Sequence, residues 1–346
     1  MTVGSACAEP ALEEKVEAMR DPARYPGGVR RIETIETHYA WVFLTDAHAY
    51  KLKKPMCVDR MDHRTLAARR ASCVAELQLN RRLAPGVYEA VVALARDERG
   101  DVGVERPGEP IEWLVKMRRL PRDAFLDRAI AAGTARRPAV RAAAAHLADF
   151  YRRAAPILVE PGAYVERIAG QVAANCAALL AADLGLPRPP VEQVEAAQRD
   201  FLAHHADLLA ARAAAGRFVE GHGDLRPEHV YLGPPPCVID CLEFDRDLRL
   251  LDPAEEIEYL ALECEGLGAR WIGDEFAEGY QAATGDSPPP PLRDFYRAHR
   301  AARRALIVGW HLRDPAYRDL EDWRTRAVAY LRLAVRDAPG PERTPR

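Results

Sequence analysis

The sequence has no long hydrophobic run and no recognisable targeting segment. None of its apolar stretches reaches the ~18–20 residues that a membrane-spanning helix requires. The N-terminal segment MTVGSACAEPALEEK has neither a basic start nor a long apolar stretch, so it does not resemble a secretory signal. We therefore expect a cytoplasmic protein without a membrane partner.

Cysteine pairs of the metal-binding kind are also absent. The seven cysteines are scattered along the chain, and no two of them form a Cys-x-x-Cys pair. This odd number and irregular spacing argue against a disulfide framework and against a zinc knuckle. Reduced thiols are the expected state of these side chains.

The chain lacks an excess of either charge. Its 49 Lys and Arg residues nearly balance its 52 Asp and Glu residues, which leaves a formal charge of −3. Nothing in this balance favours nucleic acid as a partner. The Gly-x-x-x-x-Gly-Lys-Ser/Thr motif is missing too, which excludes a P-loop kinase.

The patterns that are present divide the 346 residues into four segments. We expect a tail with a short helix at 1–24 and a small lobe rich in strands at 25–117, with one substantial helix near 63–83. A larger helical lobe follows at 118–336, and a disordered tail at 337–346. The predicted class is therefore α+β.

One stretch carries most of the chemical information. It reads His-Gly-Asp-Leu-Arg-Pro-Glu-His at 222–229 and is followed by Val-Ile-Asp at 238–240. It resembles the protein-kinase catalytic loop, His-Arg-Asp-Leu-x-x-x-Asn, which precedes a metal-binding Asp. The form with Gly223 in place of Arg is similar to the aminoglycoside phosphotransferase-like family, which includes choline kinases and other small-molecule kinases.

The resemblance extends over residues 25–335. Within the family, the sequence is similar to a bacterial subgroup. It is carried further by the segments THYAWVFLTDAHAYKLKKP, ELQLNRRLAP and VIDCLEFDRDLRLLDP. The resemblance implies a two-lobed protein-kinase-like fold that binds ATP with Mg²⁺, or with Mn²⁺. Lys51, Asp224 and Asp240 would then have to meet around one triphosphate.

Within the motif, the resemblance implies a role for each polar residue. Asp224 would accept the proton of the substrate hydroxyl, and Asp240 would bind the metal. His229 stands where the family pattern has Asn, so we expect it as a second metal ligand, although imidazole suits softer ions than Mg²⁺. Arg226 could reach the transferring phosphate, and His222 would brace the loop.

Further candidates lie upstream, in the small lobe. Ala49-Tyr50-Lys51-Leu52 resembles the kinase Val-Ala-Ile-Lys strand, and strand alternation places Lys53 on the same face as Lys51. We predict that Lys51 binds the ATP phosphates, with Lys53 as the competitor, and that Glu76 holds the lysine. The resemblance also suggests Thr37 in the phosphate-covering loop.

The adenine-binding hinge is expected near Met117, Arg118 and Arg119. Downstream of the motif, Glu243 and Asp252 match family positions that support the site. Asp252 precedes Pro253 and a helical pattern, so it is equally well explained as a helix N-cap.

The charge of the acceptor stays open at this stage. The glutamates at 255, 256, 258, 263 and 265 could bind a cationic substrate, although a solvated helix face explains them better. Arg246, Arg249 and Arg270 equally permit an anionic substrate.

Taken together, the sequence predicts a small-molecule kinase that moves the γ-phosphoryl group to a hydroxyl in one in-line step. Two alternatives remain, a nucleotide-binding regulatory pseudokinase and an enzyme of the same fold that transfers AMP. The sequence predicts no oligomeric state.

Overall fold

The computed structural model describes residues 10–58, 60–313, 319 and 321–338. They form two compact units, one from residues up to Phe125 together with Gly233–Asp247, the other from Leu126–Leu232 together with the chain from Leu248 onward. These units describe compactness only, so the lobe boundaries expected from the sequence stay a prediction. Residues 1–9 of the expected N-terminal segment and residues 339–346 of the expected C-terminal tail lie outside the described residues.

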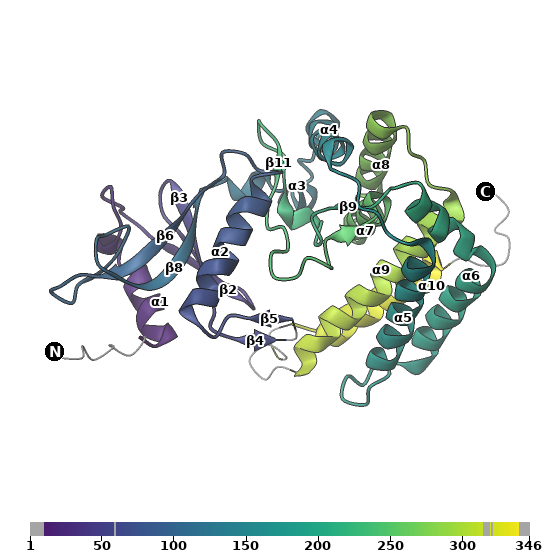
Figure 1. The fold of residues 1–346 in the computed structure, drawn as a ribbon, viewed down its shortest axis with the longest axis horizontal. Coiled ribbons are helices and arrows are strands. Elements are labelled where there is room, and N and C mark those ends of the chain that lie inside the picture. The colour runs from purple at the N-terminus through teal and green to yellow at the C-terminus, as the bar shows by residue number, and fades with distance from the viewer. Residues whose placement is uncertain (1–9, 59, 314–318, 320, 339–346) are drawn as a thin grey trace. The chain divides into compact units, whose positions relative to one another are not determined.

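The first unit is built on a six-stranded antiparallel sheet (Figure 1). Its strand order is β1-β2-β3-β8-β6-β7, so β3 lies in the middle with β2 and β8 on either side. The elements of this unit are α1 (Leu12–Arg20), β1 (Glu33–Glu36), β2 (Ala40–Leu44), β3 (His48–Lys53), β4 (Cys57–Val58), β5 (Met61–Asp62), α2 (Leu66–Asn80), β6 (Tyr88–Arg96), β7 (Val102–Val104), β8 (Glu109–Arg118) and β11 (Cys237–Val238), with short 3₁₀ turns at Pro22–Arg24 and Arg122–Ala124.

The two faces of β3 have different partners. Tyr50 and Leu52 belong to an apolar core that also contains Met19 of α1. Successive side chains of a strand point to opposite faces, and Lys51 and Lys53 accordingly contact Glu76 of α2. The alternation predicted from the sequence is thus confirmed, and it presents both lysines to the same helix.

Helix α2 begins and ends where its sequence provides signals. The Thr65 hydroxyl accepts a hydrogen bond from the backbone N–H of Ala68, which caps the first turn. The helix ends at Asn80, a few residues before Pro85-Gly86, and so lies within the predicted range of 63–83.

The second unit is mainly helical, which together with the sheet of the first unit confirms the α+β class. Phe201, Phe295 and Tyr164 are among the buried residues of one of its apolar cores. Its elements are α3 (Leu126–Ala131), α4 (Arg137–Arg153), α5 (Pro161–Leu179), α6 (Arg188–Ala214), β9 (Val219–Glu220), a 3₁₀ turn (Pro227–His229), β10 (Val230–Tyr231), β12 (Leu250–Leu251), α7 (Pro253–Gly266), α8 (Arg270–Thr284), α9 (Pro290–Trp310), a 3₁₀ turn (His311–Arg313) and α10 (Trp323–Asp337).

Short strands lead into and out of the loop that carries the kinase-like motif. β9 pairs antiparallel with β12, so Glu220 lies opposite Leu250. Helix α7 follows β12 directly, and its N-cap is Asp252, whose carboxylate accepts the N–H of Ala254. The motif loop therefore begins just after β9, and the pairing of β9 with β12 connects the start of the loop to the start of α7.

The segment that leads to Asp240 is a strand only over Cys237–Val238. β11 ends at Val238, and Asp240 has a backbone φ of 62°. A left-handed residue cannot continue an extended strand, and Asp is one of the few non-glycine residues that adopt this conformation readily.

No helix among the described residues combines the length and apolar character needed to span a membrane.

Candidate active site

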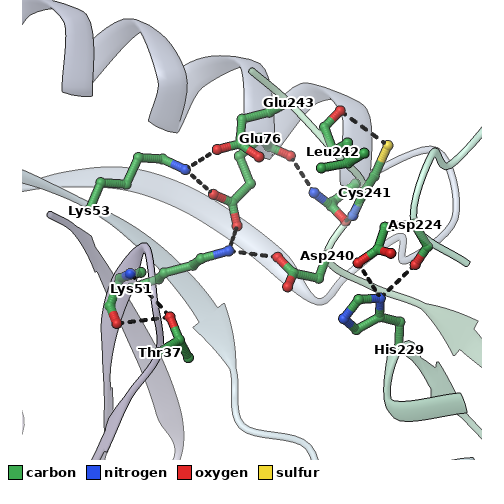
Figure 2. A network of polar contacts seen from close by, with 12 residues as sticks. Thr37, Lys51, Lys53, Glu76, Asp224, His229, Asp240, Cys241, Leu242 and Glu243 are labelled. Carbon is green, nitrogen blue, oxygen red and sulfur yellow. Dashed lines mark hydrogen bonds and ion pairs between the residues drawn. The ribbon is translucent and has the colours of Figure 1, made fainter. Parts of the chain in front are cut away.

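In the first unit, two carboxylates from distant parts of the chain, those of Glu76 and Asp240, meet at Lys51 (Figure 2). The Lys51 ammonium lies 2.9 Å from Oε1 of Glu76 and 2.6 Å from Oδ1 of Asp240. Lys53 donates to the other oxygen of Glu76, at 2.6 Å, and to Oε1 of Glu243, at 2.5 Å. The predicted lysine–glutamate pair is therefore formed, and Lys51 is the lysine that also contacts Asp240.

Burial makes this cluster electrostatically strong. Burial disfavours the charged ammonium of Lys51, but the carboxylates of Asp240 and Glu76 outweigh it and raise its pKa well above the usual value. Burial likewise opposes ionisation of Glu243, and Lys53 and Lys51 nevertheless lower the pKa of that carboxyl. The Lys51 ammonium and the Glu243 carboxyl are therefore both placed to be charged near neutral pH.

Asp240 is positioned by its backbone, from two neighbouring elements. Its N–H donates to the Tyr88 hydroxyl of β6 at 3.1 Å, and the N–H of Cys241 donates to Oδ1 of Asn80 at the end of α2. The left-handed conformation of Asp240 costs energy that these contacts offset. The side chain stays 43% exposed, so it can bind a ligand as well as Lys51.

In the second unit, the motif loop is anchored by Glu256 of α7. Its carboxylate accepts the backbone N–H groups of His222, at 3.0 Å, and Gly223, at 2.5 Å. The Tyr151 hydroxyl donates to the same carboxylate at 2.5 Å. Glu256 is buried, so these hydrogen bonds fix the loop immediately before Asp224.

The side chain of Asp224 is held as an ionised carboxylate. Nε of Arg226 donates to Oδ2 at 3.0 Å, and the Tyr259 hydroxyl donates to Oδ1 at 3.4 Å. Burial opposes ionisation, but Arg226 and His229 outweigh it and lower the pKa of Asp224 to about 2. Arg226 also pairs with Glu228, so its guanidinium is already held between two carboxylates.

His222 and His229 brace the same loop. The N–H of Asp224 donates to Nδ1 of His222 at 3.3 Å, and His222 is completely buried. Nδ1 of His229 lies 2.8 Å from the backbone carbonyl of Asp224 (Figure 2). A carbonyl only accepts, so this nitrogen carries the hydrogen, and only Nε2 of His229 could ligate a metal.

Of the two predicted metal ligands, Asp240 and His229, Asp240 is the one that suits Mg²⁺. Mg²⁺ is usually bound by one or two protein carboxylates together with phosphate oxygens and water, and Asp240 supplies such a carboxylate. The described residues contain no ready-made group of three or more His, Cys, Asp or Glu side chains for a metal. His229 offers an imidazole nitrogen, which fits a softer ion such as Mn²⁺ better.

The other predicted nucleotide-binding residues shape the backbone of the first unit. The Thr37 hydroxyl donates to the carbonyl of Ala40 and accepts its N–H, which closes the turn between β1 and β2. Met117 pairs with Ala49 of β3, and the backbone N–H of Arg118 donates to the Val87 carbonyl.

Arg119 contacts protein groups on the same unit. Its guanidinium donates to the Thr45 carbonyl at 2.8 Å and to Glu33 at 2.9 Å. Through these contacts, Arg119 stabilises one end of the sheet, and this structural role is independent of any contact with a nucleotide.

Asp252 is an N-cap and also the centre of a buried ion pair. Arg212 donates to both of its carboxylate oxygens, at 2.6 and 2.8 Å, and Tyr296 donates to Oδ2. The N-cap explanation is therefore confirmed. The carboxylate that contacts the motif loop belongs to Glu256, one turn further along α7.

The expectation of a solvated acidic face on α7 is wrong. Glu255, Glu256 and Glu258 are buried. Glu255 pairs with Arg300 at 2.7 Å, and Glu258 pairs with Arg293 at 2.5 Å. These arginines come from α9, and a sequence pattern on α7 alone could not show that another helix covers its charged residues.

The sequence analysis missed Glu256, Asn80 and Tyr88 as supporting residues. Glu256 appeared only as one of several glutamates, and Asn80 and Tyr88 are polar groups without a motif. The one available signal was that Asn80 lies within ELQLNRRLAP, a segment of the family resemblance.

Comparisons with known proteins find related sequences and solved structures of similar fold. No family model matches the chain. Uncharacterized proteins of Mycobacterium tuberculosis and Mycobacterium bovis are 34% identical over 279 residues, which is 80% of this chain and 54% of theirs. The chain thus spans about half the length of the curated relatives it matches.

Solved structures match over most of the chain. A choline/ethanolamine kinase family protein from Mesorhizobium loti is 17% identical, with a TM-score of 0.54 over 94% of this chain and 95% of that one. The GDP complex of aminoglycoside 2′-phosphotransferase-IIIa is 15% identical, with a TM-score of 0.52 over 89% and 93%. Choline kinase from Cryptosporidium parvum is 8% identical, with a TM-score of 0.51 over 94% and 95%. The expected protein-kinase-like fold is confirmed.

Proposed function

We propose that this chain belongs to the aminoglycoside phosphotransferase-like family and transfers the γ-phosphoryl group of ATP to a hydroxyl of a small molecule. The observation that carries the proposal is the Lys51 ammonium held between Glu76 and Asp240. A partly buried, oriented ammonium beside an exposed carboxylate suits a polyphosphate and its metal ion. The names of the solved structures with this fold, choline/ethanolamine kinase and aminoglycoside phosphotransferase, support the same chemistry.

In this proposal, the cluster of the first unit binds the nucleotide. Lys51 would contact the phosphates while Glu76 orients it, and Lys53 with Glu243 would hold Glu76 in place. Asp240 would be the main metal ligand, and bound Mg²⁺ would neutralise charge on the phosphate oxygens. Thr37 and the backbone near Met117, Arg118 and Arg119 are proposed contacts for the rest of the nucleotide.

Asp224 would position the acceptor hydroxyl. A new bond forms between the acceptor oxygen and the γ-phosphorus while the bond from that phosphorus to the ADP oxygen breaks. The hydroxyl proton passes to Asp224 and then to solvent. With a pKa of about 2, Asp224 is a weak base, so it orients the hydroxyl first and takes the proton late in the reaction.

The rest of the motif loop would keep Asp224 in place. His222, His229 and Glu256 hold the loop through backbone hydrogen bonds. Arg226 keeps the carboxylate ionised and could also meet the transferred phosphate. His229 is the proposed second metal ligand, through Nε2.

The identity of the nucleotide product tests this proposal. Purified protein is incubated with MgATP, MgGTP or MnATP and a panel of hydroxyl acceptors, and nucleotide binding is followed by thermal shift. Acceptor-dependent release of ADP or GDP, abolished in Asp224→Asn and Asp240→Asn, supports the proposal. The control Asp207→Asn changes an exposed aspartate of α6 and should leave turnover unaltered.

Other products identify the alternatives. Release of pyrophosphate, with the α-phosphate transferred to the acceptor, would indicate AMP transfer. Nucleotide binding without any product would indicate a regulatory protein. Absence of nucleotide binding would overturn the proposal altogether.

A further inference from the structure

A buried carboxylate in the sheet joins helices α1 and α2 of the first unit. Glu112 of β8 accepts a hydrogen bond from Nζ of Lys15, in α1, at 2.9 Å. Each of its oxygens also lies 2.9 Å from Nε of Arg69, in α2. These contacts span 97 and 43 positions along the chain, so they connect segments that are distant in sequence. We call the three side chains the charged triad.

The charged triad is almost completely removed from solvent. The side chains of Arg69 and Glu112 are fully buried, and that of Lys15 is 1% exposed. Burying charges carries a large desolvation cost, and apolar side chains of similar volume often stabilise a fold at least as well. What the charged contacts add is direction, because each hydrogen bond forms only over a narrow range of positions of its donor and acceptor.

Glu112 is a fixed point in the sheet. Its strand, β8, is paired with β3 on one side and with β6 on the other. The backbone N–H of Trp113 donates to Oε1 of Glu112 at 3.0 Å. Strand alternation places Glu112 on the same side as Leu114, which packs in one apolar core with Met19 of α1. A helix that is bonded to this carboxylate is therefore held at a defined place on the sheet.

Arg69 connects the sheet to the beginning of α2. The helix starts at Leu66, so Arg69 lies in its first turn. While Nε of Arg69 contacts the carboxylate of Glu112, its Nη1 donates to the carbonyls of His63, at 2.9 Å, and Arg64, at 3.2 Å. The guanidinium thus fixes both the first turn of α2 and the chain that enters it.

The same helix carries Glu76 to the proposed phosphate site. Arg69 and Glu76 lie about two helical turns apart, so both side chains project from the same side of α2. Glu76 is fully buried and contacts Lys51 at 2.9 Å and Lys53 at 2.6 Å. Because α2 is continuous over Leu66–Asn80, a displacement of its first turn also displaces Glu76.

We infer that Lys15 and Arg69 are positioning residues of the proposed phosphate site. They act through Glu112 on helix α2, and Glu76 of that helix in turn orients Lys51. The inference rests on the proposed function and adds the N-terminal helix α1 to the parts of the protein on which nucleotide binding depends. Neither Lys15 nor Arg69 contacts the nucleotide itself.

MgADP is the probe of this inference, because its binding requires no acceptor. Its affinity for the full chain is measured by calorimetry. Lys15→Met should weaken MgADP binding about 2- to 30-fold, because α2 loses one of the contacts that place it. Lys15→Arg, which keeps a cation beside Glu112, should recover most of the affinity. The matched control is Arg20→Met, which removes an exposed cation of α1 and should leave the affinity unaltered.

A double-mutant cycle separates positioning from a general loss of stability. If Lys15 acts through Glu76, its effect on MgADP affinity must disappear once Glu76 is replaced. Lys15→Met should therefore cause no further loss of affinity in the Glu76→Gln background, although it should still lower the melting temperature there. The same loss of affinity in both backgrounds would overturn the inference, and so would an unchanged affinity of Lys15→Met.

Removal of all three charges keeps the test decisive if Lys15→Met does not fold. The triple variant Lys15→Met, Arg69→Met and Glu112→Leu leaves no member of the charged triad buried without a partner, so it should fold. We expect it to bind MgADP about 2- to 30-fold more weakly than the wild type, because apolar contacts do not fix the direction of α2. Wild-type affinity in the triple variant would assign the charged triad to stability alone and overturn the inference.

The wild-type protein distinguishes a failure of this inference from a failure of the proposed function. Absence of MgADP binding to the wild type would overturn both. Binding that Lys51→Met weakens and Lys15→Met leaves unchanged would overturn the inference alone.

Discussion

The ammonium of Lys51 lies 2.6 Å from a carboxylate oxygen of Asp240, although 189 positions separate the two residues along the chain. Both side chains belong to the first compact unit, because the segment Gly233–Asp247 returns to it. The contact joins the residue proposed to bind phosphates with the residue proposed to bind metal.

Substitution of Lys51 should mainly reduce turnover, whereas substitution of Lys53 should mainly reduce stability. Lys51→Met should reduce turnover by about 10²-fold or more, because it removes a charge that would face the phosphates. Stability should fall less, because Asp240 is 43% exposed and Glu76 keeps Lys53.

Lys53→Met should instead act mainly on stability. It leaves Glu243 and Glu76 buried with one partner fewer, at a cost of about 3–5 kcal/mol in the free energy of unfolding. Urea denaturation and ADP release measured on both variants check the pair. Equal effects on turnover would contradict the assignment of Lys51 over Lys53.

Glu256 should support catalysis without touching substrate. In Glu256→Gln, one carboxylate oxygen becomes an N–H₂ group, so only one of the two loop N–H groups, that of His222 or that of Gly223, still finds an acceptor. We expect a loss of about 1–3 kcal/mol in stability and a fall in kcat, with nucleotide affinity retained.

Tyr151→Phe is the control for this change, since it removes the other hydrogen bond to Glu256 and leaves the loop contacts in place. Its kcat should stay close to that of the wild type. A normal kcat in Glu256→Gln would show that the loop does not depend on this carboxylate.

The pKa of Asp224 predicts a pH-dependent contribution to stability. Its folded value of about 2 lies below the ordinary 3.8, so folding favours the ionised form. The resulting stabilisation, about 2 kcal/mol, is present above pH 4 and disappears as the pH falls towards 2.

Unfolding curves of wild type and Asp224→Asn between pH 2 and 7 measure this contribution. The difference between the two proteins should shrink below pH 4. The same pKa implies that kcat does not fall between pH 7 and 5 through protonation of Asp224, and a difference in stability that is independent of pH would refute the assignment.

His229 should influence the choice of metal. His229→Asn restores the residue type of the kinase pattern, and its amide N–H₂ could still donate to the Asp224 carbonyl. We expect the ratio of Mg²⁺-supported to Mn²⁺-supported turnover to rise, because an amide oxygen suits Mg²⁺ better than imidazole does.

Steady-state rates with each metal, measured at saturating ATP, give this ratio. His229→Leu serves as the comparison that removes both the hydrogen bond and the ligand atom. An unchanged ratio in His229→Asn would assign His229 to loop bracing alone.

The sequence was informative wherever the signal was local. The alternation in β3 placed Lys51 and Lys53 on one face, and Pro253 after Asp252 indicated a helix start. The prediction of Lys51 over Lys53 depended on resemblance to the kinase strand, because both lysines contact Glu76 and only the contact with Asp240 distinguishes them. The glutamates of α7 were wrongly expected to be solvated because the arginines that pair with them belong to α9, a distant part of the chain.

By itself, the sequence determined the α+β class, the motif loop around Asp224 and the cap of α7, because strand alternation, turn residues and capping act over a few neighbouring positions. Only the tertiary structure decided the partner of Lys51 and the anchoring of the loop by Glu256. Each of these depends on burial and on charges contributed by distant segments, and such energies exist only once the chain has folded.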